Sequence, residues 1–127
     1  MFNATIVINL NLEDFLQIED PSREYEESEL VFNIDVGKVI LNKIIELVDN
    51  IGFYASISDC LDDYARYQTL SRTEKGCFLD EAGKTFRNLV DKNEVKLIHC
   101  SFNPTNYGDY EIYATINLDL DTLIDKV

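Results

Sequence analysis

The sequence lacks the residues and spacings on which most catalytic and metal-binding sites depend. It has one histidine, His99, five glycines that are nowhere clustered, and three cysteines, Cys60, Cys77 and Cys100, with no CxxC pair. Glycine-rich phosphate-binding loops and the HExxH and GxSxG signatures are all missing. Cysteines spaced this widely argue against a disulfide framework or a zinc cage, and they predict small apolar side chains in or near the core.

Long apolar runs are missing as well. No stretch approaches the roughly 20 apolar residues that a membrane helix needs. The first residues, MFNATIVINLNLEDF, alternate apolar with polar side chains, which is typical of a strand and not of a leader peptide. A chain of 127 residues is long enough to bury one core. We therefore expect a single cytoplasmic domain, residues 1–127, without a membrane partner and without a cofactor.

The few candidates for chemistry lie in the second half of the chain. His99 adjoins Cys100, but neighbours on a strand point to opposite faces, so their side chains cannot form a catalytic dyad. Asp119, Asp121 and Asp125 offer the oxygen ligands that calcium prefers, but the glycine and the terminal glutamate of an EF-hand loop are missing. We therefore predict no enzyme and neither catalytic nor metal-binding residues. A deep pocket that joined His99 to a cysteine, or two carboxylates to each other, would indicate an enzyme instead.

Basic residues are scarce, above all in the first half. The chain has 24 acidic and 11 basic residues, which gives a formal net charge of −13. Residues 1–63 carry 14 acids and 3 bases, whereas residues 64–127 carry 10 acids and 8 bases. Such a field repels DNA, RNA and anionic membranes and attracts basic protein surfaces. The alternative is that the acids serve solubility alone.

Hydrophobic alternation predicts strands near both ends of the chain, with helices between them. The predicted strands are residues 5–12, 29–36, 94–102 and 110–120, and the predicted helices are residues 38–50, 59–67 and 79–91. Residues 53–57 fit either a short strand or the entry to a helix. Residues 13–28, 69–76 and 103–109 are predicted connections. The last two strands should pair antiparallel, since a short turn-rich segment joins them.

This order, β–β–α–α–α–β–β, predicts an α+β fold. About four strands would form an antiparallel sheet, and about three central helices would cover one of its faces. Seven tyrosines accompany the acids, and tyrosine is enriched at protein interfaces because it buries a large area with few rotatable bonds. The predicted partner-binding residues are Glu13, Asp14, Glu19, Asp20, Glu24, Tyr25, Glu26, Glu27, Glu29, Asp59, Asp62, Asp63 and Tyr67.

The composition and the segment LVFNIDVGKVILNKIIELVDNIGFY, Leu30 to Tyr54, resemble small acidic phage-encoded inhibitors of bacterial defence, of the anti-CRISPR and anti-restriction type. The resemblance implies a nucleic-acid mimic that docks on a basic nuclease or nucleic-acid-binding effector in the host-cell cytoplasm and blocks its groove. Two alternatives stay open. One is a toxin immunity protein, and the other is a structural domain that forms a homodimer through a sheet edge.

Overall fold

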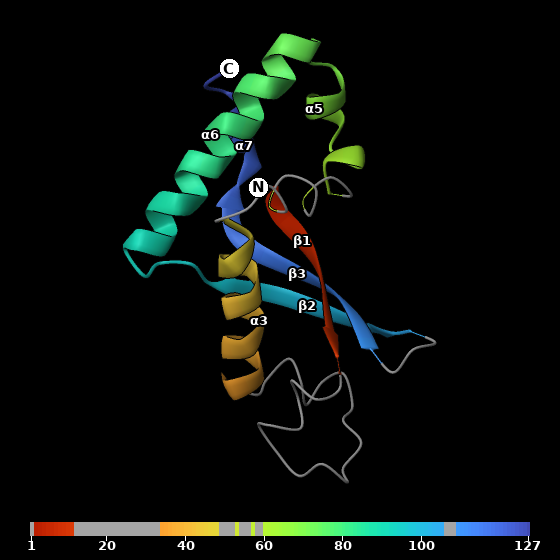
Figure 1. Ribbon diagram of the computed structural model, residues 1–127. Coiled ribbons are helices and arrows are strands. Elements are labelled where there is room, and N and C mark those ends of the chain that lie inside the picture. Colours follow the sequence, from red (N-terminus) through yellow and green to blue (C-terminus); the bar gives the residue numbers. More distant parts are fainter. Residues whose placement is uncertain (1, 12–33, 49–52, 54–56, 58–59, 106–108) are drawn as a thin grey trace, which may run out of the picture.

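In the part of the chain that the structure describes, three antiparallel strands form a sheet with helices on one face. The computed structural model describes residues 2–11, 34–48, 53, 57, 60–105 and 109–127. Within these ranges the elements are β1 (Asn3–Asn11), α3 (Ile34–Val48), α5 (Ala65–Gln68), α6 (Arg72–Asp91), β2 (Leu97–Pro104), β3 (Asp109–Asp119) and α7 (Leu120–Ile124). Figure 1 shows α3 crossing in front of β2 and β3, α6 running past α7 at the end of β3, and α5 beyond the start of β1. The predicted α+β class is confirmed.

Strand β3 lies in the middle of the sheet, in the order β1-β3-β2. It pairs antiparallel with both neighbours, so Thr5 of β1 and Cys100 of β2 lie opposite Thr115 and Ala114 of β3. The predicted antiparallel pairing of the last two strands is therefore confirmed. The alternation of side chains also holds. One face of the sheet is buried, and it carries Ala4, Ile6, Ile8, Leu10, Cys100, Phe102, Ile112, Ala114, Ile116 and Leu118.

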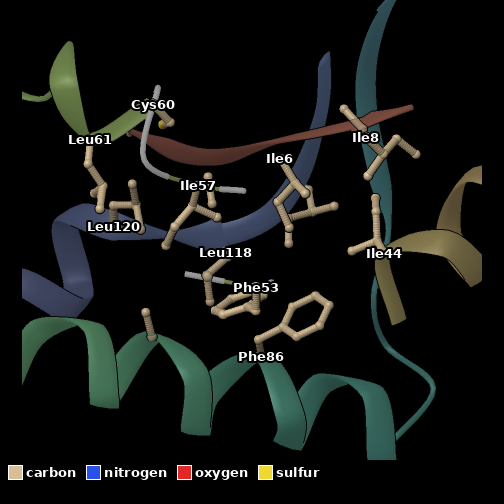
Figure 2. Packing of buried hydrophobic residues seen from close by; sticks show 14 of the residues in the cluster. Ile6, Ile8, Ile44, Phe53, Ile57, Cys60, Leu61, Phe86, Leu118 and Leu120 are labelled. Atoms are coloured by element: carbon tan, nitrogen blue, oxygen red, sulfur yellow. The ribbon is translucent and has the colours of Figure 1, made fainter. Parts of the chain in front are cut away.

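Two helices close this buried face. Ile40 and Ile44 of α3 and Phe78 and Phe86 of α6 are fully buried in the same cluster as the strand residues. Figure 2 shows Phe86 rising from α6 toward the strands and meeting Phe53, whose ring centroid lies 4.8 Å away. Because aromatic rings and branched aliphatic side chains supply most of this interior, apolar burial is the main source of the stability of the fold.

Helix α6 begins at a capping box. The Ser71 side chain accepts a hydrogen bond from the backbone N–H of Glu74, and the Glu74 side chain accepts one from the N–H of Ser71. Residues 69–76 were predicted as a connection, which is wrong from Arg72 onward because this cap starts the helix earlier. No helix in the described ranges combines the length and apolar character needed to cross a membrane.

Other predicted boundaries differ from the structure. Residues 34–36 belong to α3 and not to a second strand, while residues 29–33 of that predicted strand lie outside the described residues. The predicted helix 59–67 is interrupted, because Tyr64 is extended (φ −92°, ψ 97°) just before α5. Leu120 begins α7 instead of ending β3. The described part of the chain therefore has three strands in its sheet and not four.

Candidate protein-binding site

The predicted partner-binding residues divide into two groups. Asp62, Asp63 and Tyr67 lie in the described ranges, just before and within α5. The other ten lie outside the described residues: Glu13, Asp14, Glu19, Asp20, Glu24, Tyr25, Glu26, Glu27, Glu29 and Asp59. The described part of the site therefore consists of Asp62, Asp63 and Tyr67 with the residues around them.

Asp62 and Asp63 are both exposed, and Tyr67 is half-buried. The Tyr67 ring packs against Phe78, with centroids 5.4 Å apart, and Lys75 Nζ lies 5.2 Å from the Tyr67 centroid. Burial, and next the charge of Asp62, raise the pKa of Tyr67. Tyr67 therefore lies close to the acid as predicted, but its ring is partly committed to the core.

The nearest base in sequence does not neutralise these two acids. Arg66 turns instead to the C-terminal helix, where its guanidinium forms a close ion pair with Asp125 and lies 3.8 Å from Asp121 Oδ1. Hydrogen bonding to Asp125 raises the pKa of Arg66. Neither Asp62 nor Asp63 forms an ion pair with any base in the described ranges. The pair thus presents two uncompensated negative charges to solvent.

Asp121 joins three distant segments. Its Oδ2 accepts a hydrogen bond from the backbone N–H of Phe2 at 2.8 Å, and its Oδ1 accepts one from the Tyr64 hydroxyl at 2.5 Å. The Phe2 and Tyr64 rings stack, with centroids 4.3 Å apart. Hydrogen bonds from Tyr64 and Phe2 lower the pKa of Asp121, whereas burial and the bond to Asp121 raise the pKa of Tyr64 to about 12. This network fixes the start of β1 against α5 and α7.

The same network accounts for the aspartates considered as calcium ligands. Asp119 is the N-cap of α7, since its Oδ1 accepts hydrogen bonds from the N–H groups of Asp121 and Thr122. Asp121 accepts hydrogen bonds from Phe2 and Tyr64, and Asp125 forms an ion pair with Arg66. Across the described ranges, no three or more histidine, cysteine or acidic side chains are placed to hold a metal ion. Helix capping and ion pairing thus account for all three carboxylates.

We expect Asp121→Asn to be less stable than the unmodified chain at pH 7 and to lose less stability in acid. The folded state lowers the pKa of Asp121 below its unfolded value of about 3.9. The stabilisation is therefore present above pH 4 and disappears as the pH falls through the lower folded-state pKa. Urea denaturation between pH 2 and pH 8 measures this difference. The exposed acid Asp80 of α6 supplies the control, Asp80→Asn, and equal pH profiles for both variants would contradict the assignment.

A pocket opens beside Asp63 on the sheet face opposite the core. It has a volume of about 190 Å³ and is lined by Phe2, Thr5, Cys60, Asp63 and Tyr113; we call it the Asp63 pocket. Apart from Asp63, these residues were not predicted as site residues. The alternation does place Thr5 and Tyr113 on the outer face of their strands, but only the β1–β3 register brings them together. The pocket therefore extends the predicted acidic site onto the sheet.

The cysteines and the histidine do not form a catalytic arrangement within the described ranges. His99 is exposed while Cys100 is buried, which confirms that the two point to opposite faces. Burial raises the pKa of Cys100 to about 11 and also raises that of Cys60. A thiol with a raised pKa stays protonated at neutral pH and is a poor nucleophile. The predicted place in or near the core is wrong for Cys77, which is exposed on α6.

A second concavity lies between α3 and the end of α6. It has a volume of about 210 Å³, and the described residues that line it are Lys38, Leu41, Asn42, Ile45, Val90, Asn93 and Val95. Leu41 and Ile45 of α3 are half-buried and face this groove, because the core occupies the adjacent stripe of Ile40 and Ile44. None of these described lining residues is acidic, and none of them lines the Asp63 pocket.

No family model, no curated protein and no solved structure matches this chain. Its function is therefore inferred from the residues of the site themselves.

Proposed function

We propose that this chain is an inhibitor that binds a basic nucleic-acid-handling protein, such as a CRISPR or restriction effector, and covers its nucleic-acid-binding surface. The observation that carries the proposal is the exposed pair Asp62 and Asp63, which has no basic partner among the described residues. Two adjacent carboxylates resemble the successive charges of a phosphate backbone. Lysines and arginines that grip phosphates can therefore bind them as well.

The charge distribution supports the same function. Residues 1–63 contain 14 acids and only 3 bases. Arg66, a base close to them in the sequence, forms ion pairs with Asp121 and Asp125. An excess of one charge speeds the encounter with an oppositely charged partner and fixes the orientation of the complex. Tyr67, next to Asp62, adds a half-buried ring of the kind that anchors interfaces.

We expect Asp62→Lys/Asp63→Lys to weaken binding to a basic effector by about tenfold or more, since it replaces attraction by repulsion at the contact. The effector is first captured from a bacterial lysate. Its affinity for the chain is then measured by surface plasmon resonance at 50 and 500 mM salt, together with competition by its nucleic acid. Affinity should fall steeply with salt because exposed charges are screened within about 8 Å at physiological ionic strength.

The matched control is Asp80→Lys/Asp91→Lys, which changes the net charge by the same amount at two exposed positions of α6. This control should keep most of the affinity. Equal losses in both double variants would mean that only the total charge matters. Affinity that is independent of salt, or an effector that binds nucleic acid and this chain at the same time, would contradict the proposed function.

A further inference from the structure

The Asp63 pocket has a rigid frame. Thr5 and Tyr113 project from neighbouring antiparallel strands, and Thr5 is diagonal to Tyr113 because it lies opposite Thr115. The hydroxyls of Thr5 and Thr115 are 3.1 Å apart and share a hydrogen bond. Phe2 is fixed by stacking on Tyr64. Strand pairing and ring stacking therefore fix Thr5, Tyr113 and Phe2, and a ligand need not reorganise these walls.

The lining of the pocket combines aromatic, polar and acidic groups. The described lining residues bring together two aromatic rings, those of Phe2 and Tyr113, the Cys60 thiol, the Thr5 hydroxyl and the carboxylate of Asp63. The buried Cys60 thiol donates a hydrogen bond to the carbonyl oxygen of Asn3 at 3.5 Å, and its raised pKa keeps it uncharged. Glu111, whose carboxylate accepts a hydrogen bond from the Tyr113 hydroxyl, adds a second negative charge near one wall.

Such a lining matches a cation that also has a flat or apolar surface. A cation gains from the faces of aromatic rings as well as from a carboxylate. Arginine fits better than lysine, because its planar guanidinium stacks on rings and presents several donors at once, whereas an ammonium is compact and strongly hydrated. Asp63 and the Thr5 hydroxyl can accept from two different N–H groups of one guanidinium.

We propose that the Asp63 pocket receives an arginine side chain of the partner protein, with Asp63 as its counter-ion and Tyr113 and Phe2 as its walls. This inference rests on the proposed function, since it names the residue type that the basic partner inserts. It makes the pocket the anchor of the complex, while the adjacent Asp62 contributes to the surrounding charge.

The test is an NMR titration of the full ¹⁵N-labelled chain with N-acetyl-arginine amide. Shifts should concentrate at Thr5, Asp63 and Tyr113, with a dissociation constant on the order of millimolar, as a fragment of this size allows. N-acetyl-citrulline amide, the neutral analogue, and N-acetyl-lysine amide should both bind more weakly. Asp63→Asn should weaken the arginine probe by about three- to fivefold, the range of a partly exposed ion pair, and Asp62→Asn should leave it nearly unchanged.

Equal affinity for the citrulline or lysine probe, or equal effects of the two variants, would overturn the assignment of the pocket. The proposed function fails separately. If the arginine probe binds in the pocket but no basic effector displaces it, the assignment of the pocket stands and the proposed function does not. If Asp63→Asn still binds a captured effector with full affinity, the function stands and the pocket assignment does not.

Discussion

Ile44→Ala is expected to lower the free energy of unfolding by about 2–5 kcal/mol. Ile44 is fully buried on α3 and contacts the cluster that joins the helix to the sheet. Truncation removes three buried carbons and leaves a cavity, because a close-packed interior relaxes only in part. A loss of this size is a large share of the 5–15 kcal/mol that stabilises a typical domain. Urea denaturation followed by circular dichroism measures it.

The neighbouring residue supplies a matched control. Ile45 is identical in chemistry, lies on the same helix and is half-buried at the groove instead of in the core. Ile45→Ala should cost no more than about 1 kcal/mol, because less area returns to water and alanine favours the helix. Equal losses for Ile44→Ala and Ile45→Ala would mean that both stripes of α3 are buried against the sheet.

Phe86→Ala is expected to cost about 3–5 kcal/mol, which is the usual range for a buried aromatic ring. Phe86 lies at the contact between α6 and the rest of the core, and its ring stacks on Phe53 at 4.8 Å. The loss combines the apolar transfer energy, the cavity and the ring pairing. Thermal denaturation should therefore show a strong fall in melting temperature, and the variant should bind a hydrophobic dye more readily if its core loosens.

Two further variants separate these contributions. Phe86→Leu keeps most of the volume and removes the ring pairing, so it should cost clearly less than alanine. Leu89→Ala, at a half-buried position one turn along the same helix, should also cost less. If Phe86→Ala kept the melting temperature of the unmodified chain, the Phe86 side chain would not be the contact by which α6 closes the core.

The strands were predictable because their alternation is simple. Ile6, Ile8 and Leu10 repeat at the two-residue period, and the same period runs from Ile112 to Leu118 in β3. One face of the sheet is buried against helices, so a shift of register by one residue would expose the whole apolar set. Pattern and burial therefore agree over the described parts of both strands.

The start of α3 was predicted incorrectly because its local signals conflict. Ile34 and Val36 are β-branched and spaced by two, which favours a strand, and Gly37 suggests a boundary. The structure continues the helix through all three positions. A Cβ at Gly37 would meet no atom within 4 Å, so nothing nearby requires glycine there. Tertiary packing of the following turns evidently outweighs local propensity, which contributes less than about 1 kcal/mol per residue.

The start of α6 could have been found. Ser71 and Glu74 have the spacing of a capping box, and this signal precedes an amphipathic run. A helix that begins at this cap includes Phe78, which is buried. By contrast, the link between Arg66 and Asp121 has no local signature, since the two residues are far apart in the chain.

The acidic site was predictable only in part, because some of its features are local in the sequence and others are not. Asp62 and Asp63 precede a short helix, and charged side chains there are expected to be solvated, as they are. The pocket beside them depends on which strands are neighbours. Its Thr5 and Tyr113 come together only through the β1–β3 pairing, which the chain sequence does not specify locally. Composition thus predicted the charge of the site, whereas its shape required the tertiary structure.

The position of β3 between β1 and β2 has a consequence for biosynthesis. Thr5 and Thr115 face each other but are 110 residues apart in the chain, so β1 leaves the ribosome about 5–20 s before its partner strand at ordinary translation rates. During that interval neither outer strand has its central neighbour, and their apolar side chains have no sheet to join. The described sheet can therefore assemble only after β3 has been made, and until then the high net charge of the chain opposes aggregation.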